Sequence, residues 1–139
     1  GVLHAPKVFI SYSHADKAIV LDLYHQLKGK NVNIWLDQFE LSPGVLFQKE
    51  IEQSLRTSDA MLMVLSRNSN SSKWVPFEGA FFSGQNKLII PVVLDEEGKS
   101  MASELPFLQG RFYADLSNAE ARKKSVAKLS STLSELQRR

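Results

Sequence analysis

Short runs of β-branched, aliphatic and aromatic residues alternate along the chain with segments in which apolar residues recur at helical spacing. The short runs are Val8–Ser11, Val32–Leu36, Met61–Leu65, Leu88–Leu94 and Phe112–Leu116. Their centres lie about 23–29 residues apart, which leaves room for a crossover helix between successive parallel strands. The alternation therefore predicts an α/β protein with five parallel strands.

Four other segments carry apolar residues three or four positions apart, as amphipathic helices do. These residues are Ile19, Leu23 and Leu27; Phe47, Ile51 and Leu55; Trp74, Phe77 and Phe81; and Val126, Leu129, Leu133 and Leu136. Asp16 and Gly29 are start and stop signals for the first helix, and Ser117 with Glu120 predicts a capping box for the last. The remaining gap, Asp95–Gly110, is less regular and is expected to be mostly loop.

Strands and helices in this order predict a flavodoxin-like fold with strand order 2-1-3-4-5 and helices on both faces of the sheet. Ligands of such sheets bind beyond the carboxyl ends of the strands, where the strand order reverses. We therefore expect a crevice between Ser11–Asp16 and the residues that follow Ser66. Pro91 removes a backbone donor from the fourth run, so that strand is expected near an edge or a local irregularity.

The composition is that of a single globular domain. The chain has 139 residues, 43% of them apolar and 23% charged, with a net charge of +2. The basic excess falls in residues 111–139, on a helix face expected to be solvated, so no nucleic-acid partner is expected. The longest apolar run, Leu88–Leu94, is too short to cross a bilayer, so no membrane partner is expected.

The first residue is glycine, not methionine. We therefore expect residues 1–139 to be one domain, with its core at about 7–137, taken from a larger cytoplasmic protein. The sequence contains no cysteine and none of the motifs GxGxxG, GxxxxGK[ST] or GxSxG, which removes the usual anchors of dinucleotide-fold, P-loop and serine-hydrolase enzymes. His4, His14 and His25 lack metal-ligand spacing, so no metal is expected, and no motif in the chain indicates a cofactor.

One charged residue interrupts an apolar helical pattern. Glu78 lies one turn after Trp74 and is flanked on the helical wheel by Phe81 and Phe82. A carboxylate among aromatic rings is an environment typical of a functional acid. The alternative is a glutamate at the edge of the apolar stripe that extends to water or pairs with a lysine.

Four sequence blocks resemble the consecutive signature blocks of a Toll/interleukin-1 receptor (TIR) domain: VFISYS at 8–13, WLD at 35–37, SKWVPFE at 72–78 and IIPV at 89–92. The resemblance covers nearly the whole chain and implies the same flavodoxin-like fold. The sequence SYSHAD at 11–16 is more similar to bacterial TIR effectors than to plant immune receptors or animal adaptors.

The resemblance implies cleavage of NAD+ between nicotinamide and ribose, with NAD+ as substrate and Glu78 as the catalytic residue. Trp74 would help to shape the pocket. The departing nicotinamide leaves an oxocarbenium-like ribose, which one carboxylate can stabilise or trap. By the same resemblance, other residues would bind the substrate: Phe9, Tyr12, Ser13, His14, Trp35 and Asp37. Ser13 and His14 stand where some NAD-cleaving relatives carry arginine.

The resemblance also implies self-association through a loop at residues 38–47, which would gate the pocket and join neighbouring domains. Its residues at that contact would be Phe39, Leu41, Pro43 and Gly44. The partners would be other TIR domains and an attached sensor outside this chain, in bacterial antiphage signalling. Two other interpretations stay open: a TIR–TIR scaffold without catalysis, and a flavin or phosphoacceptor protein with the same fold.

Overall fold

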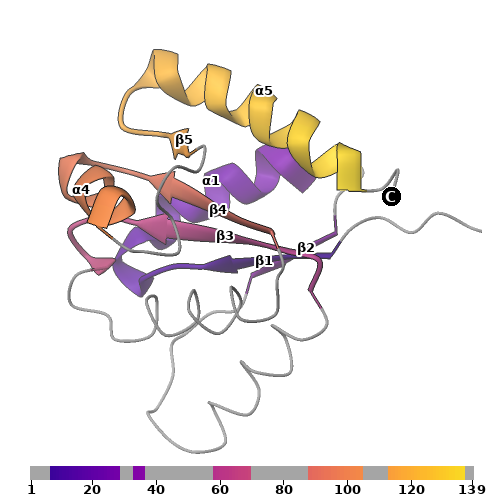
Figure 1. The fold of residues 1–139 in the computed structure, drawn as a ribbon, viewed down its shortest axis with the longest axis horizontal. Coiled ribbons are helices and arrows are strands. Elements are labelled where there is room, and N and C mark those ends of the chain that lie inside the picture. Colours follow the sequence, from indigo (N-terminus) through magenta and orange to yellow (C-terminus); the bar gives the residue numbers. More distant parts are fainter. Residues whose placement is uncertain (1–6, 29–32, 37–57, 70–87, 105–112, 137–139) are drawn as a thin grey trace, which may run out of the picture.

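Five parallel strands form a single sheet in the order β2-β1-β3-β4-β5 (Figure 1). The computed structural model describes residues 7–28, 33–36, 58–69, 88–104 and 113–136. The strands are β1 (Lys7–Ser11), β2 (Asn33–Leu36), β3 (Ala60–Leu65), β4 (Leu88–Val93) and β5 (Ala114–Asp115). The predicted strand order and the parallel pairing are both confirmed.

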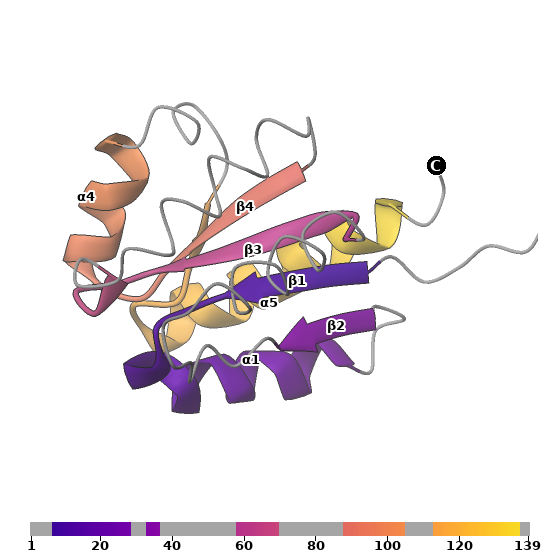
Figure 2. The same ribbon diagram turned by 90° about the horizontal axis from the view of Figure 1, so that it is seen from below.

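Two helices cover one face of this sheet. They are α1 (Lys17–Lys28) and α5 (Ala119–Leu136), which Figures 1 and 2 show on the same side of the strands. Alternate strand residues form a core with them, because successive side chains of a strand point to opposite faces. The strand residues of this core are Val8, Ile10, Ala60, Leu62, Val64, Ile90, Val92 and Ala114, and the helix residues are Val20, Leu23, Leu27, Val126, Leu129 and Leu133.

The opposite face of the sheet is buried as well. Phe9, Met61, Met63 and Leu65 alternate with the core residues and are 0% exposed. A parallel sheet with two buried faces requires strands that are apolar throughout, and β3, with the sequence AMLMVL, has this form. The helices predicted around Phe47 and around Trp74 fall outside the described residues.

A third helix, α4 (Glu96–Glu104), occupies part of the gap that was expected to be mostly loop. That expectation is wrong for these nine residues. Asp95 begins the helix, because its Oδ1 accepts a hydrogen bond of 2.8 Å from the backbone N–H of Gly98. The buried residues of α4 are Gly98, Met101 and Ala102, and two of these are too small to give an apolar periodicity.

Two details of the predicted helices differ in the structure. In α1 the buried residue of the first turn is Val20, whereas Ile19 is 37% exposed. In α5 the cap is Asn118 and not Ser117: Asn118 Oδ1 accepts a hydrogen bond of 2.8 Å from the N–H of Ala121. The N–H of Ser117 donates instead to Asp115 Oδ1.

Pro91 lies inside β4, where it is paired in register with Met63 of β3. β4 is not at the edge of the sheet, but the neighbouring β5 has only two residues, paired with Val92 and Val93. The described pairing at Pro91 is therefore on the β3 side alone. β5 is also shorter than the predicted run Phe112–Leu116, within which residue 112 lies outside the described residues.

Candidate functional site

The carboxyl ends of β1 and β3 lie side by side in the sheet, with Ser11 of β1 in register with Met63 of β3. From β1 the chain continues to β2 on one side, whereas β3, β4 and β5 follow one another on the other side. The strand order therefore reverses between β1 and β3, as the sequence predicted. The crevice typical of open α/β sheets belongs at this point.

The β1 side of this point holds several of the predicted substrate-binding residues. Phe9 is 0% and Tyr12 3% exposed, while Ser13 is partly exposed. His14 is the first residue of the short 3-10 helix η1 (His14–Asp16). Trp35 is placed beside Phe9 by the register of β2 against β1. β1 with the residues that follow it, η1 and β2 thus contribute backbone positions to one side of the sheet edge.

Ser11, the last residue of β1, has a buried hydroxyl. Its side chain is 0% exposed, and its Oγ has no hydrogen-bond partner among the described residues. A buried hydroxyl without a partner is costly, and such groups recur at functional sites. The sequence places Ser11 at the start of the expected crevice but does not assign it a role in the site.

A hydrogen-bond network joins η1 to the turn after β3. Ser66 Oγ donates to Asp16 Oδ2 at 2.6 Å, and Asn68 Nδ2 donates to Asp16 Oδ1 at 2.7 Å. Asp16 precedes α1, as expected for a cap, but both hydrogen bonds described for its carboxylate go to the turn after β3. Asp16 is only 5% exposed and Ser66 1%, so the link is enclosed within the protein.

The turn formed by residues 66–69 is also closed by its own hydrogen bonds. The N–H of Ser66 donates to Ser69 Oγ at 3.0 Å, and Ser69 Oγ donates to the carbonyl oxygen of Val64 at 3.0 Å. The N–H of Ser69 donates to the carbonyl oxygen of Ser66, also at 3.0 Å. From the β4 side, Asp95 Oδ2 accepts a hydrogen bond of 3.1 Å from the N–H of Arg67. The turn therefore has fixed partners on both sides.

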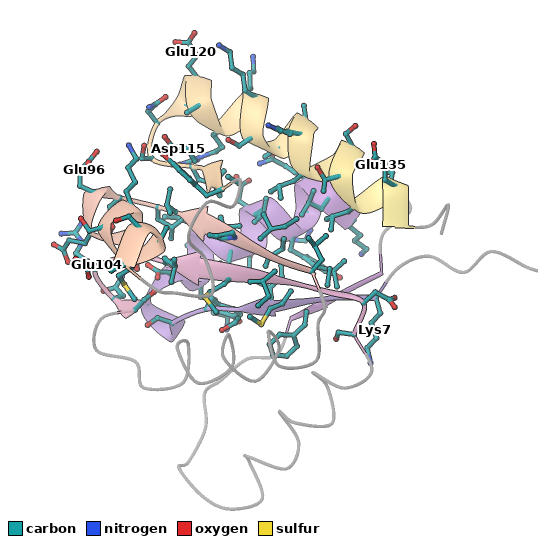
Figure 3. The ribbon with its side chains drawn as sticks, viewed as in Figure 1. Lys7, Glu96, Glu104, Asp115, Glu120 and Glu135 are labelled. Carbon is teal, nitrogen blue, oxygen red and sulfur yellow. The ribbon has the colours of Figure 1, made fainter. Side chains whose placement is uncertain are left out.

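Farther along the same edge, Lys99 of α4 bridges two carboxylates. Its Nζ lies 3.2 Å from Glu96 Oε1 and 3.5 Å from Asp115 Oδ2. Figure 3 shows Glu96 and Asp115 at this end of the molecule and Lys7 at the opposite end of the sheet. Polar links thus follow the carboxyl edge from η1 to β5.

This bridge changes the proton affinities of both partners. The hydrogen bond to Glu96 is the main cause that raises the pKa of Lys99, and burial opposes it. Burial acts to raise the pKa of Asp115, but hydrogen bonds from Ser117 and the nearby Lys99 charge together bring it below its usual value. Both groups are therefore held in their charged forms.

The remaining predicted site residues lie outside the described residues: Asp37, Phe39, Leu41, Pro43, Gly44, Trp74 and Glu78. Within residues 7–28, 33–36, 58–69, 88–104 and 113–136, no group of three or more histidine and acidic side chains could hold a metal ion. None of the helices in that part of the chain has the length and apolar character needed to cross a bilayer.

The sheet order, the helices on its face and the polar carboxyl edge define a flavodoxin-like α/β domain whose strand order reverses between β1 and β3. Comparison with known proteins gives the family. Residues 8–130 match the TIR domain family, and the chain belongs to it.

Two curated relatives carry the names of enzymes. The chain is 32% identical over 106 residues to "NAD(+) hydrolase TcpA" of a Theionarchaea archaeon, a match that covers 70% of this chain and 32% of the relative. It is also 32% identical over 90 residues to "2' cyclic ADP-D-ribose synthase AbTIR" of Acinetobacter baumannii, covering 61% of this chain and 34% of the relative. The matches span about a third of these relatives' length.

A solved structure agrees with the fold. The crystal structure of a prokaryotic SEFIR domain superposes with a TM-score of 0.66 at 26% identity. The superposition covers 93% of this chain and 99% of the SEFIR chain. The similarity therefore extends over the whole domain and is not limited to the four sequence blocks.

Proposed function

We propose that this TIR domain cleaves NAD+ at the bond between nicotinamide and ribose. The observation that carries the proposal is the match to the TIR family together with relatives named as an NAD+ hydrolase and a cyclic ADP-ribose synthase. Both names describe reactions that begin with loss of nicotinamide from NAD+. The glutamate four positions after Trp74, Glu78, gives this chain a carboxylate for that step.

The chemistry requires little from the protein beyond placement and charge. The glycosidic C–N bond breaks, and its electron pair neutralises the pyridinium ring, so nicotinamide leaves without needing a proton. The ribose is left with oxocarbenium character, which the Glu78 carboxylate would stabilise or trap covalently. Water then adds to give ADP-ribose and a proton, or a hydroxyl of the same molecule adds to give a cyclic isomer.

We further propose that the substrate binds between the ends of β1 and β2 and the segment that follows β3. Phe9, Tyr12, Ser13 and His14 would lie on the β1 side. The residues from the other segments would be Trp35, Asp37 and Trp74. The register that places Trp35 beside Phe9 supports this grouping.

We also propose that the domain works as an assembly in the cytoplasm, joined through Phe39, Leu41, Pro43 and Gly44. An attached sensor would bring the copies together during antiphage signalling. NAD+ loss would then be the output of the assembly.

The test is nicotinamide release from NAD+ by the purified chain, crowded on beads so that its copies touch. Glu78→Gln keeps the size of the side chain and removes its charge, and we expect it to lower kcat by about 10²–10³-fold. Glu104→Gln, in the last turn of α4, is the matched control and should keep the wild-type rate. If wild-type beads with demonstrated contact between copies release no nicotinamide, the proposal is wrong and a scaffold role takes its place.

A further inference from the structure

We propose that Asp16 is a positioning residue, which through Ser66 and Asn68 fixes the turn at residues 66–69 relative to β1 and thereby helps to place Trp74 and Glu78, which follow this turn in the sequence. This inference rests on the proposed function, because it assigns Asp16 a role in the same site. Asp16 touches neither the substrate nor the reacting atoms in this proposal. It acts through the turn at residues 66–69.

The geometry of the link is that of a two-point clamp. Each carboxylate oxygen of Asp16 accepts one hydrogen bond, from Ser66 Oγ at 2.6 Å and from Asn68 Nδ2 at 2.7 Å. Hydrogen bonds to an ionised acceptor are shorter and stronger than those between neutral groups. Two bonds to separate oxygens fix both the distance and the rotation of the turn relative to Asp16.

The turn itself passes this restraint along the chain. The N–H of Asn68 donates to the same Ser66 Oγ that Asp16 holds, at 3.0 Å. Ser69 is tied back to Val64 and Ser66. Residues 66–69 therefore form one rigid unit whose position depends on Asp16 on one side and on Asp95 on the other.

Burial of the Asp16 carboxylate costs free energy. Asp16 is 5% exposed, and no lysine or arginine of the described residues forms an ion pair with it. Its neutral donors must replace the water that burial removes, at a cost that an apolar residue would avoid. This cost is accounted for if the site requires an accurately placed turn.

The sequence puts the two halves of the candidate site on either side of the clamp. Tyr12 and Ser13 come directly before η1, while Trp74 and Glu78 are five and nine residues after Ser69. Asp16 and Ser66 are 50 positions apart along the chain. They provide a direct side-chain link between the segments that would supply the pocket and the carboxylate.

The first measurement is kcat and KM for nicotinamide release by wild type, Asp16→Ala, Asp16→Asn and Ser66→Ala. An error of about 1 Å in a catalytic group can cost about 100-fold in rate. We therefore expect Asp16→Ala and Ser66→Ala each to lower kcat by about 10- to 100-fold. A variant that carries both substitutions should have a kcat no lower than that of the slower single variant, because both changes break the same link. Asp16→Asn can keep one of the two bonds and should fall in between. Asp22→Ala, which alters an exposed carboxylate of α1 bonded to Gln26, should match wild type.

The second measurement does not depend on activity. Trp35→Phe leaves Trp74 as the single tryptophan, so acrylamide quenching then reports on the segment after the turn. In this background we expect Asp16→Ala to change the quenching of Trp74 while circular dichroism remains that of the folded protein. Asp22→Ala should leave the quenching unchanged.

The two measurements separate the two proposals. Unchanged Trp74 quenching in folded Asp16→Ala overturns the positioning role, as does wild-type kcat in that variant. If Trp74 quenching changes but wild type releases no nicotinamide, the positioning role holds and the proposed enzymatic function fails.

Discussion

Gly98 in α4 packs directly against the backbone at the end of β3. A Cβ at this position would overlap the carbonyl group of Leu65 and lie 3.2 Å from the nitrogen of Ser66. These are backbone atoms held in the sheet and in the turn after it, so they cannot move aside easily. The absence of a side chain at Gly98 therefore allows α4 to reach the strand ends.

Gly98→Ala should destabilise the protein even though alanine favours helices over glycine. Overpacking of this kind costs about 1–3 kcal/mol in the free energy of unfolding. Urea unfolding followed by circular dichroism measures the loss. Ser100→Ala, at an exposed position of the same helix, is the control and should be neutral or slightly stabilising; equal stability of Gly98→Ala and wild type would contradict the packing argument.

Asp16 shows why single residues of the site are harder to predict than their neighbourhood. The sequence identifies it as a helix start, and α1 does begin at Lys17. Its hydrogen-bond partners, Ser66 and Asn68, are 50 and 52 positions away. Only the strand order brings them together, so a local pattern cannot reveal the link. A search for polar residues after both β1 and β3 could have found it.

At the scale of elements, helices with large apolar residues were predictable and the helix with small ones was not. α5 buries Val126, Leu129 and Leu133, and periodicity finds it. α4 has no such stripe, and its remaining sequence signal was the run Asp95-Glu96-Glu97 at its start. An N-cap aspartate followed by acidic residues in the first turn is a helix signal, although it also fits a solvated turn.

The start of α5 offers a matched pair of variants one residue apart. Asn118→Ala removes the side-chain oxygen that accepts from the N–H of Ala121 and should lower the free energy of unfolding by about 1 kcal/mol. Ser117→Ala should cost less, because it leaves the Asn118 cap in place and keeps the backbone N–H that donates to Asp115 Oδ1. Urea titrations of the two variants compare them directly, and a larger loss for Ser117→Ala would contradict the assignment of the cap to Asn118.

At the scale of the whole molecule, the fold could be predicted almost entirely. The regular spacing of the apolar runs predicts a parallel sheet, and the right-handedness of crossover connections allows only a few strand orders for it. For the candidate site, the sequence predicts the location, which is the point where the strand order reverses between β1 and β3, but not the contacts between its residues. Glu78 and the loop residues from Phe39 to Gly44 remain predictions, because they lie outside the described residues.

Stability should depend on pH through Asp115. Its pKa is lowered in the folded protein, so its stabilising contribution is complete above about pH 4 and is lost as the pH falls through the lower folded value. Asp115→Asn keeps an oxygen for the N–H of Ser117 but removes the charge. We expect it to be less stable than wild type at pH 7, with the difference shrinking toward pH 3.

Unfolding in urea at both pH values measures this difference. In a Lys99→Met background, which removes the cation and keeps the aliphatic chain, the pH 7 effect of Asp115→Asn should be smaller. The same loss at both pH values in both backgrounds would contradict the assignment to the Lys99 bridge.

The position of β1 between β2 and β3 has a consequence for synthesis of the protein. The bond between Asp16 and Ser66 spans 50 positions, and ribosomes add about 5–20 residues each second. One edge of β1, with the apolar residues Val8, Phe9 and Ile10, therefore waits about 2.5–10 s for β3 to be made. An unpaired apolar strand edge can pair with other chains and aggregate. During translation we therefore expect β1 to be the segment that a ribosome-associated chaperone binds.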